Sequence, residues 1–139
     1  MTQYSTLYLR CLQKLEDPQL AALPEEDLEG LLHGYMMSAI AKHRKCEHDL
    51  SDRDDELKQF NSELSDLEIE LLAILMLREY ITVRLHSVTN VLQVFGGKEE
   101  KYYSQASHIA ELRELDERLK IEAQHLSRDF TYEGNDYFD

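Results

Sequence analysis

Three stretches of this chain hold residue types that could do chemistry. In the first, His43, Cys46 and His48 carry the imidazole and thiol groups that zinc prefers. On a helix His43 and Cys46 share a face, but His48 comes two residues after Cys46 and lies on another side. A zinc site needs four ligands, or three and a water, and Cys11 is distant in the sequence with no second ligand beside it. We therefore predict no metal centre here.

The second stretch is acidic and has the spacing of a calcium loop. Asp52, Asp54, Glu56 and Glu63 fall at positions one, three, five and twelve of such a loop. Position six needs a sharp turn, normally a glycine, and this chain has Leu57 there. Because the surrounding composition favours helix, a solvated acidic helix is the better interpretation.

The third candidate is the glycine pair Gly96-Gly97, which reads as a helix terminator. The sequence contains no Gly-x-Ser-x-Gly elbow, no glycine-rich phosphate loop and no His-Glu-x-x-His motif. Its six histidines share no spacing, and its acidic residues are too numerous to single out a general acid–base pair. We predict a protein that is not an enzyme and that takes no cofactor.

The amino-acid composition limits the kinds of partner that the protein can bind. Of 139 residues, 28 are Asp or Glu and 15 are Lys or Arg, which gives a formal net charge of −13. Such a chain repels phosphate backbones, so general nucleic-acid binding is not expected. The most apolar run, residues 71–77, is far shorter than the roughly 20 residues of a spanning helix, and no secretory signal is visible. We expect no membrane contact, and a reducing compartment with two free thiols.

The elements that would position these residues are helices. Prolines 18 and 24 end one helix and open the next, and Ser65 with Glu68 matches a capping box at the start of a central helix. Residues 48–62 read as a turn or as a thin, largely exposed helix. The fold class is therefore all-α, a small bundle of about four helices. The expected helices cover about residues 6–15, 24–46, 65–92 and 104–128.

Two regions are more apolar or aromatic than a small bundle requires. The central helix is apolar on nearly all sides, so either its own domain or neighbouring subunits must surround it. Residues 129–139 hold four aromatic residues without a helical or strand repeat, and we treat them as a C-terminal extension of a domain formed by residues 1–128. These aromatic side chains either fold back on the domain or dock on a neighbouring chain. The predicted contact residues are Leu72, Leu75, Met76, Tyr80, Phe130, Tyr132, Tyr137 and Phe138.

The segments 49–61 and 64–70, with the closing pattern Asp129-Phe130-Thr131-Tyr132, resemble small helical proteins encoded among the capsid and neck genes of tailed bacteriophages. The resemblance covers residues 28–132 and implies a head–tail connector, or adaptor, in the neck of the virion, assembled in the host cytoplasm. Such a helical bundle repeats as a homo-oligomeric ring, commonly a dodecamer, between the portal protein and a neighbouring neck or tail protein.

The same resemblance implies that a terminal extension inserts into the next ring and that DNA passes through the central channel. No catalytic residues carry over, because connectors have none. An acidic channel wall would suit DNA that slides without specific binding, since fixed negative charge avoids phosphate contacts.

An alternative from another class is a small acidic regulatory module that covers a basic protein surface one-to-one. It needs a single partner and no ring, and its binding should weaken steeply as salt screens the charges.

Overall fold

The computed structural model of this chain describes residues 1–15, 22–43, 49–95 and 99–135, and the side chains of residues 1–15, 22–43, 49–86 and 107–128. Within these ranges four helices dominate and three two-residue strands form a small sheet, so the predicted all-α class is confirmed. The helices are α1 (Tyr4–Gln13), α3 (Glu25–Lys42), α4 (Asp66–Phe95) and α5 (Glu99–Asn135). The strands are β1 (Thr2–Gln3), β2 (Arg53–Asp54) and β3 (Gln59–Phe60).

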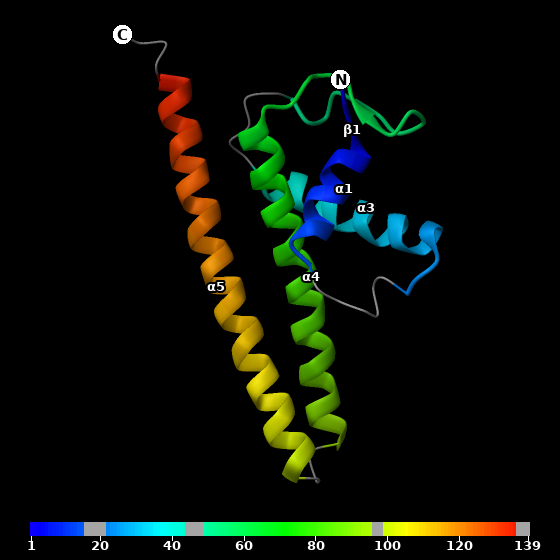
Figure 1. Cartoon of the computed structure of the whole chain (residues 1–139), viewed down its shortest axis with the longest axis vertical. Helices are drawn as coiled ribbons and strands as arrows, with labels where there is room; N and C mark the ends of the chain where they lie inside the picture. Colours follow the sequence, from blue (N-terminus) through cyan, green and yellow to red (C-terminus); the bar gives the residue numbers. More distant parts are fainter. Residues whose placement is uncertain (16–21, 44–48, 96–98, 136–139) are drawn as a thin grey trace.

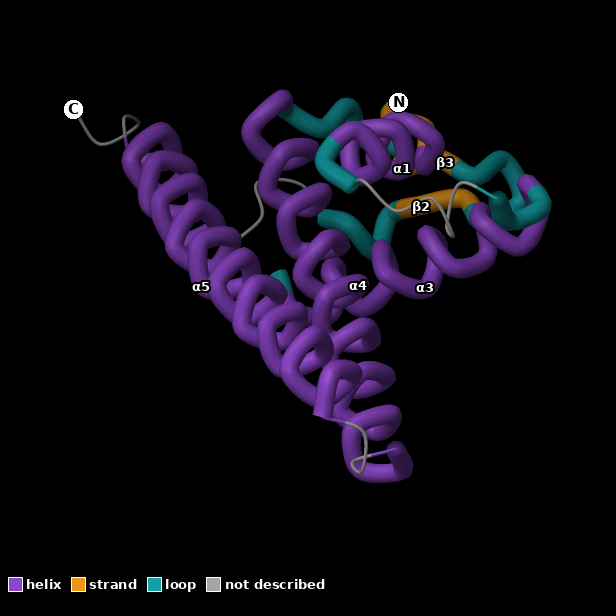
Figure 2. Tube along the Cα trace, turned by 60° about the horizontal axis from the view of Figure 1, so that its bottom comes forward, coloured by secondary structure: helices purple, strands orange, loops and turns teal. Residues whose placement is uncertain are grey.

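Helix α4 is the centre of the arrangement. It lies between α5 on one side and α1 with α3 on the other in both views (Figures 1 and 2), and it packs against all three. Its start is the predicted capping box: the Ser65 amide donates to Glu68 Oε1 at 3.1 Å, and the Glu68 amide donates to Ser65 Oγ at 3.2 Å. Three packing neighbours explain why the sequence of α4 is apolar on nearly all sides.

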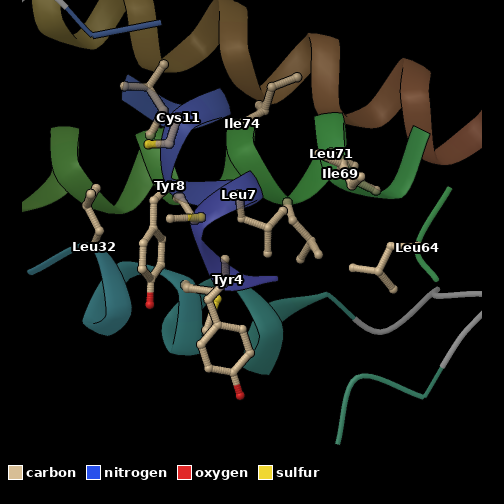
Figure 3. Packing of buried hydrophobic residues seen from close by; sticks show 14 of the residues in the cluster. Tyr4, Leu7, Tyr8, Cys11, Leu32, Leu64, Ile69, Leu71 and Ile74 are labelled. Atoms are coloured by element: carbon tan, nitrogen blue, oxygen red, sulfur yellow. The ribbon is translucent and has the colours of Figure 1, made fainter. Parts of the chain in front are cut away.

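The core lies where α1, α3 and the first half of α4 meet (Figure 3). Each large apolar side chain that is fully buried here contributes roughly 1.5–3 kcal/mol to the free energy of unfolding. The fully buried residues include Tyr4, Leu7, Cys11, Leu32, Met36, Phe60, Leu71, Leu72, Ile74, Met76 and Ile81.

The second helix begins where the sequence predicts. Pro24 precedes the first turn of α3, and its carbonyl accepts the amide of Leu28 at 3.0 Å. The acidic residues of that turn favour the positive end of the helix dipole. The helix ends at Lys42, before the expected residue 46, and residues 44–48 lie outside the described part of the chain.

Residues 49–62 hold short strands, so the predicted acidic helix is wrong and the alternative of a turn is confirmed. Strand β2 pairs antiparallel with β3, and β1 pairs antiparallel with the other edge of β3, in the order β1-β3-β2. Asp54 Oδ1 accepts the amides of Glu56 at 2.9 Å and Leu57 at 3.1 Å, a local bonding pattern that competes with helix. Lys58 closes the turn with a left-handed φ of 53°.

The buried residue Thr2 ties the sheet to the start of α4. Its Oγ1 accepts the amide of Leu64 at 2.9 Å, one residue before the capping box. Leu64 and Ile69 both belong to the core cluster, where we expect a hydrophobic residue before the cap to pack against the first turns.

Helices α4 and α5 form a long antiparallel hairpin whose far end extends beyond α1 and α3 (Figure 1). As predicted, α4 ends at Phe95, before the glycine pair. Helix α5 begins earlier than expected, at Glu99, and continues past residue 128 to Asn135, so the first residues of the expected non-helical extension are helical. Since α5 packs mainly on α4, its buried and half-buried apolar side chains between residues 107 and 128 form one stripe. The stripe contains Leu112, Leu115, Leu119, Ala123 and Leu126.

Candidate functional site

The four contact residues predicted on α4 fall into two groups. Leu72 and Met76 are both 0% exposed and belong to the core of the single chain, so no partner can reach them in this arrangement. Leu75 and Tyr80 are half-buried. The Tyr80 ring meets Tyr35 of α3 edge-on, with ring centroids 6.3 Å apart and planes at 77°, so much of its surface is used within the chain.

The predicted contacts near the C-terminus remain predictions. Phe130 and Tyr132 lie in the last turns of α5, beyond the residues whose side chains the structure describes. Tyr137 and Phe138 lie outside the described residues altogether.

Ion pairs join α4 to each helix around it. Such half-exposed pairs contribute little to stability, about 0–1 kcal/mol each, but they fix which faces of the helices meet. Partial burial acts to raise the pKa of Glu70, yet hydrogen bonds from Lys14 and Arg10 outweigh it and hold that pKa below its ordinary value. The pairs are Arg10–Glu70 at 2.8 Å and Lys14–Glu70 to α1, Lys42–Glu79 to α3, and Arg78–Asp116 at 2.9 Å to α5.

Besides the tyrosines of α1, the titratable groups in or beside the core include the buried Cys11 and Glu68 and the half-buried His43. Burial raises the pKa of the Cys11 thiol to about 12, which leaves it protonated and unreactive. Burial lowers the pKa of His43 at the end of α3, and the nearby carboxylate of Glu68 partly opposes the effect. Glu68 itself is 1% exposed and serves the capping box, so its position is accounted for by structure.

Of the metal-ligand candidates, Asp52 and Asp54 have structural roles, and Glu56 and Glu63 are exposed. Asp52 Oδ1 accepts Asn61 Nδ2 at 2.8 Å, and Asp54 caps the β2–β3 turn, so both carboxylates hold the strands together. No group of three or more His, Cys, Asp or Glu side chains in the described residues is placed to hold a metal ion. Cys46 and His48 fall within the undescribed residues 44–48.

A surface groove, which the sequence did not reveal, lies between α1, the first half of α3 and the β2–β3 turn. One part is an apolar depression of about 440 Å³. An adjoining, more polar part of about 460 Å³ contains Glu26, Gly30, His33 and Asp55. The two parts share Tyr4, Tyr8, Glu29 and Lys58, and the apolar part adds Gln3, Ser5, Leu9, Leu12, Glu25, Leu28, Leu32 and Leu57.

Two tyrosines form the floor of this groove, one helical turn apart on α1. Both rings extend from α1 toward α3 (Figure 3). Tyr4 donates its hydroxyl to Asp55 Oδ1 at 2.7 Å, and the Tyr8 hydroxyl lies 3.1 Å from His33 Nδ1. Burial, assisted by Asp55, raises the pKa of Tyr4, and burial with the charge of Glu29 raises the pKa of Tyr8 to about 12. Neither phenol can therefore act as a base near neutral pH.

A second surface lies on the side of α5 that faces away from α4, and we call it the outer face. Between residues 107 and 128, where the side chains of α5 are described, four exposed acids are interspersed with four exposed bases. This part of the face is therefore close to neutral, whereas the chain as a whole has a formal charge of −13. Its charged residues are Glu111, Arg113, Glu114, Glu117, Arg118, Lys120, Glu122 and Arg128.

Neither the groove nor the outer face was predicted as a site. Tyr4 and Tyr8 at a one-turn spacing, and Leu57 alone within an acidic run, were the available signals for the groove. The sequence of α5 shows charged residues at helical spacing. It does not show that this side of the helix is exposed in the folded chain.

No helix in the described ranges is long and apolar enough to cross a membrane. No family model, no curated protein and no solved structure matches this chain. A function for it has to come from its own residues and geometry.

Proposed function

We propose that this chain is a non-enzymatic structural protein of the tailed-bacteriophage neck, a head–tail connector that assembles as a homo-oligomeric ring between portal and tail. The resemblance of residues 28–132 to neck proteins supplies the biological class. The proposal that the chain assembles is supported by the charge of the outer face of α5. This surface is nearly neutral, whereas the chain is strongly acidic.

Charge explains why this face suits self-association. Copies of a chain with a net charge of −13 repel one another, and the repulsion is strongest where acidic surfaces meet. A face with interspersed acids and bases brings little net charge to the contact and can pair oppositely charged residues across it. The outer face also carries Ile121, which is 47% exposed and would gain from burial.

The shape of the hairpin supports the same proposal. In a hairpin of two helices each helix buries one stripe against the other. A bundle of three or four helices encloses the apolar faces more fully. A neighbouring copy packed along α5 would supply the missing helices. The acidic remainder of the chain would then suit a channel through which DNA passes without binding.

The first test is the solution mass by light scattering at two protein concentrations and two salt levels. We expect a mass of many subunits, reduced toward the monomer by Arg118→Glu, which makes the outer face acidic. The matched control is the exchange Glu114→Arg with Arg118→Glu, which restores the charge balance and should restore the mass. A monomer under every condition would contradict assembly through α5 and favour the one-to-one binding module.

Removal of residues 130–139 tests the predicted role of the C-terminal aromatic residues. Among the described side chains of α5, Leu126 is the last that packs against the core cluster, so we expect the truncated chain to keep its melting temperature. Assembly with the neighbouring neck protein should weaken, because Phe130, Tyr132, Tyr137 and Phe138 are lost. If truncation instead unfolded the monomer, the aromatic residues would belong to the core.

A further inference from the structure

The groove between α1, α3 and the β2–β3 turn is lined by solvent-exposed apolar side chains from two different elements. Leu9 on α1 is 61% exposed and Leu57 in the turn is 66% exposed, and both line the same depression. Single exposed leucines are ordinary on protein surfaces, but two that border one apolar depression form a continuous patch. Burial of this patch would release free energy that the isolated chain does not use.

The position of Leu57 is held by the backbone around it. Asp54 accepts the Leu57 amide at 3.1 Å, and the next residue, Lys58, has a left-handed φ of 53°. Lys58 also pairs with Glu29 of α3 at 2.5 Å, which anchors the turn to the opposite bank. The groove is therefore preformed, and a ligand would not have to order the turn on binding.

The rim of the groove is acidic. Glu25, Glu26, Glu29 and Asp55 line its two parts, and among the lining residues Lys58 is the one lysine or arginine. Lys58 is paired with Glu29, and Arg53 lies 3.9 Å from Asp55. Glu25 and Glu26 therefore set the sign of the local potential. A ligand that brings positive charge would be attracted, and an acidic one would be repelled.

Gly30 leaves room for a close approach to α3. It lies in the interior of the helix and lines the groove, and a Cβ added there would meet nothing within 4 Å. Glycine weakens a helix interior, so its presence without an internal packing reason fits a surface that another chain approaches.

We propose that this groove binds a segment of a partner protein in which apolar side chains are combined with Lys or Arg. The apolar depression takes the apolar side chains, and the carboxylates of the rim take the cations. The chain's own residues 129–139 do not fit, because they contain four acids and no Lys or Arg. The groove is separate from the outer face of α5, so this proposal and the ring can fail independently.

The probe is a library of random displayed peptides, selected on the full chain, with enriched peptides then labelled and titrated by fluorescence anisotropy. We expect enrichment of peptides that combine Lys or Arg with Leu, Ile or Phe. The double variant Leu9→Ser with Leu57→Ser should weaken their binding about tenfold or more. The control, Leu31→Ser with Val83→Ser, removes exposed apolar side chains that do not line the groove and should leave binding unchanged.

The charge is tested with Glu25→Gln and Glu26→Gln, which should weaken binding several-fold and flatten its salt dependence. Asp27→Asn with Glu63→Gln, which changes two exposed acids that do not line the groove, is the matched control. All these side chains are exposed, and unchanged melting temperatures will show that the variants fold.

Three results would overturn the proposal: no enriched peptide, enrichment of acidic peptides, or equal binding by the groove variant and the wild type. A fall in the chain's own oligomeric mass in the Leu9→Ser, Leu57→Ser variant would also overturn it, because the occupant would then be a second copy.

Discussion

The N-terminal body, which comprises α1, α3, the three strands and the first half of α4, differs from the α4–α5 hairpin in how its helices are held. In the body, α4 is covered by two helices and most of its side chains between Leu71 and Ile81 are buried. In the hairpin, α5 packs mainly on one helix and buries a single stripe. The body is thus stabilised by helices on several sides of α4, whereas one side of α5 is exposed over its described residues.

The largest expected effect comes from truncating one leucine in each region. Leu72→Ala removes a fully buried side chain from the body and should lower the free energy of unfolding by about 2–5 kcal/mol. Leu115→Ala removes a half-buried one from α5 and should lower it by only about 1 kcal/mol in the monomer. Urea unfolding of both variants measures the difference. Equal losses would show that the hairpin is enclosed as fully as the body.

The capping box lies in the body, at the start of α4. Ser65→Ala removes the acceptor of the Glu68 amide and should cost about 1 kcal/mol. A double-mutant cycle with Glu68→Gln should show coupling, because the two residues bond each other's amides. Additive losses would mean that Glu68 is held by its other surroundings.

The helices were predictable because their signals are local. The capping box, Pro24 and the break after Phe95 lie within a few residues of the helix ends that they determine. The strands were not predictable, since each has two residues and pairs with a distant segment: Thr2 opposes Phe60 across 58 positions. The groove is also non-local, because α1, α3 and the turn each supply part of its lining.

The predicted contact residues show the same difference between local sequence signals and contacts made by distant segments. Apolar spacing identified Leu72 and Met76 as positions that need burial, which is correct. The spacing could not say whether the chain itself or a neighbour buries them, because that depends on where α1 and α3 pack.

A smaller effect is expected from a glycine in α3. A Cβ at Gly34 would meet nothing within 4 Å, so Gly34→Ala should stabilise the body by about 0.5–1 kcal/mol through the lower entropy of the unfolded chain. Thermal unfolding measures the gain. A loss would reveal a close contact on this side of α3.

The smallest expected effect depends on pH and comes from the half-buried His43 at the end of α3. The folded-state pKa of His43 lies below its ordinary value of 6.5, so the unfolded chain takes up a proton more readily. Stability should therefore fall as the pH drops below 6.5, and His43→Gln should reduce this fall. Urea unfolding at a series of pH values measures the difference. An identical pH profile for His43→Gln and wild type would contradict the prediction.

The pairing of Thr2–Gln3 with residues 59–60 has a consequence for synthesis on the ribosome. Strand β1 and helix α1 emerge early, but the strand that pairs with β1 and the helix that covers α1 emerge only after Phe60 and Ile81 have been translated. Until then the apolar side of α1, with Leu7 and Cys11, has only α3 to pack on. The nascent chain should therefore depend on chaperones or rapid elongation through this window, and slow codons between residues 14 and 80 should lower the yield of folded protein.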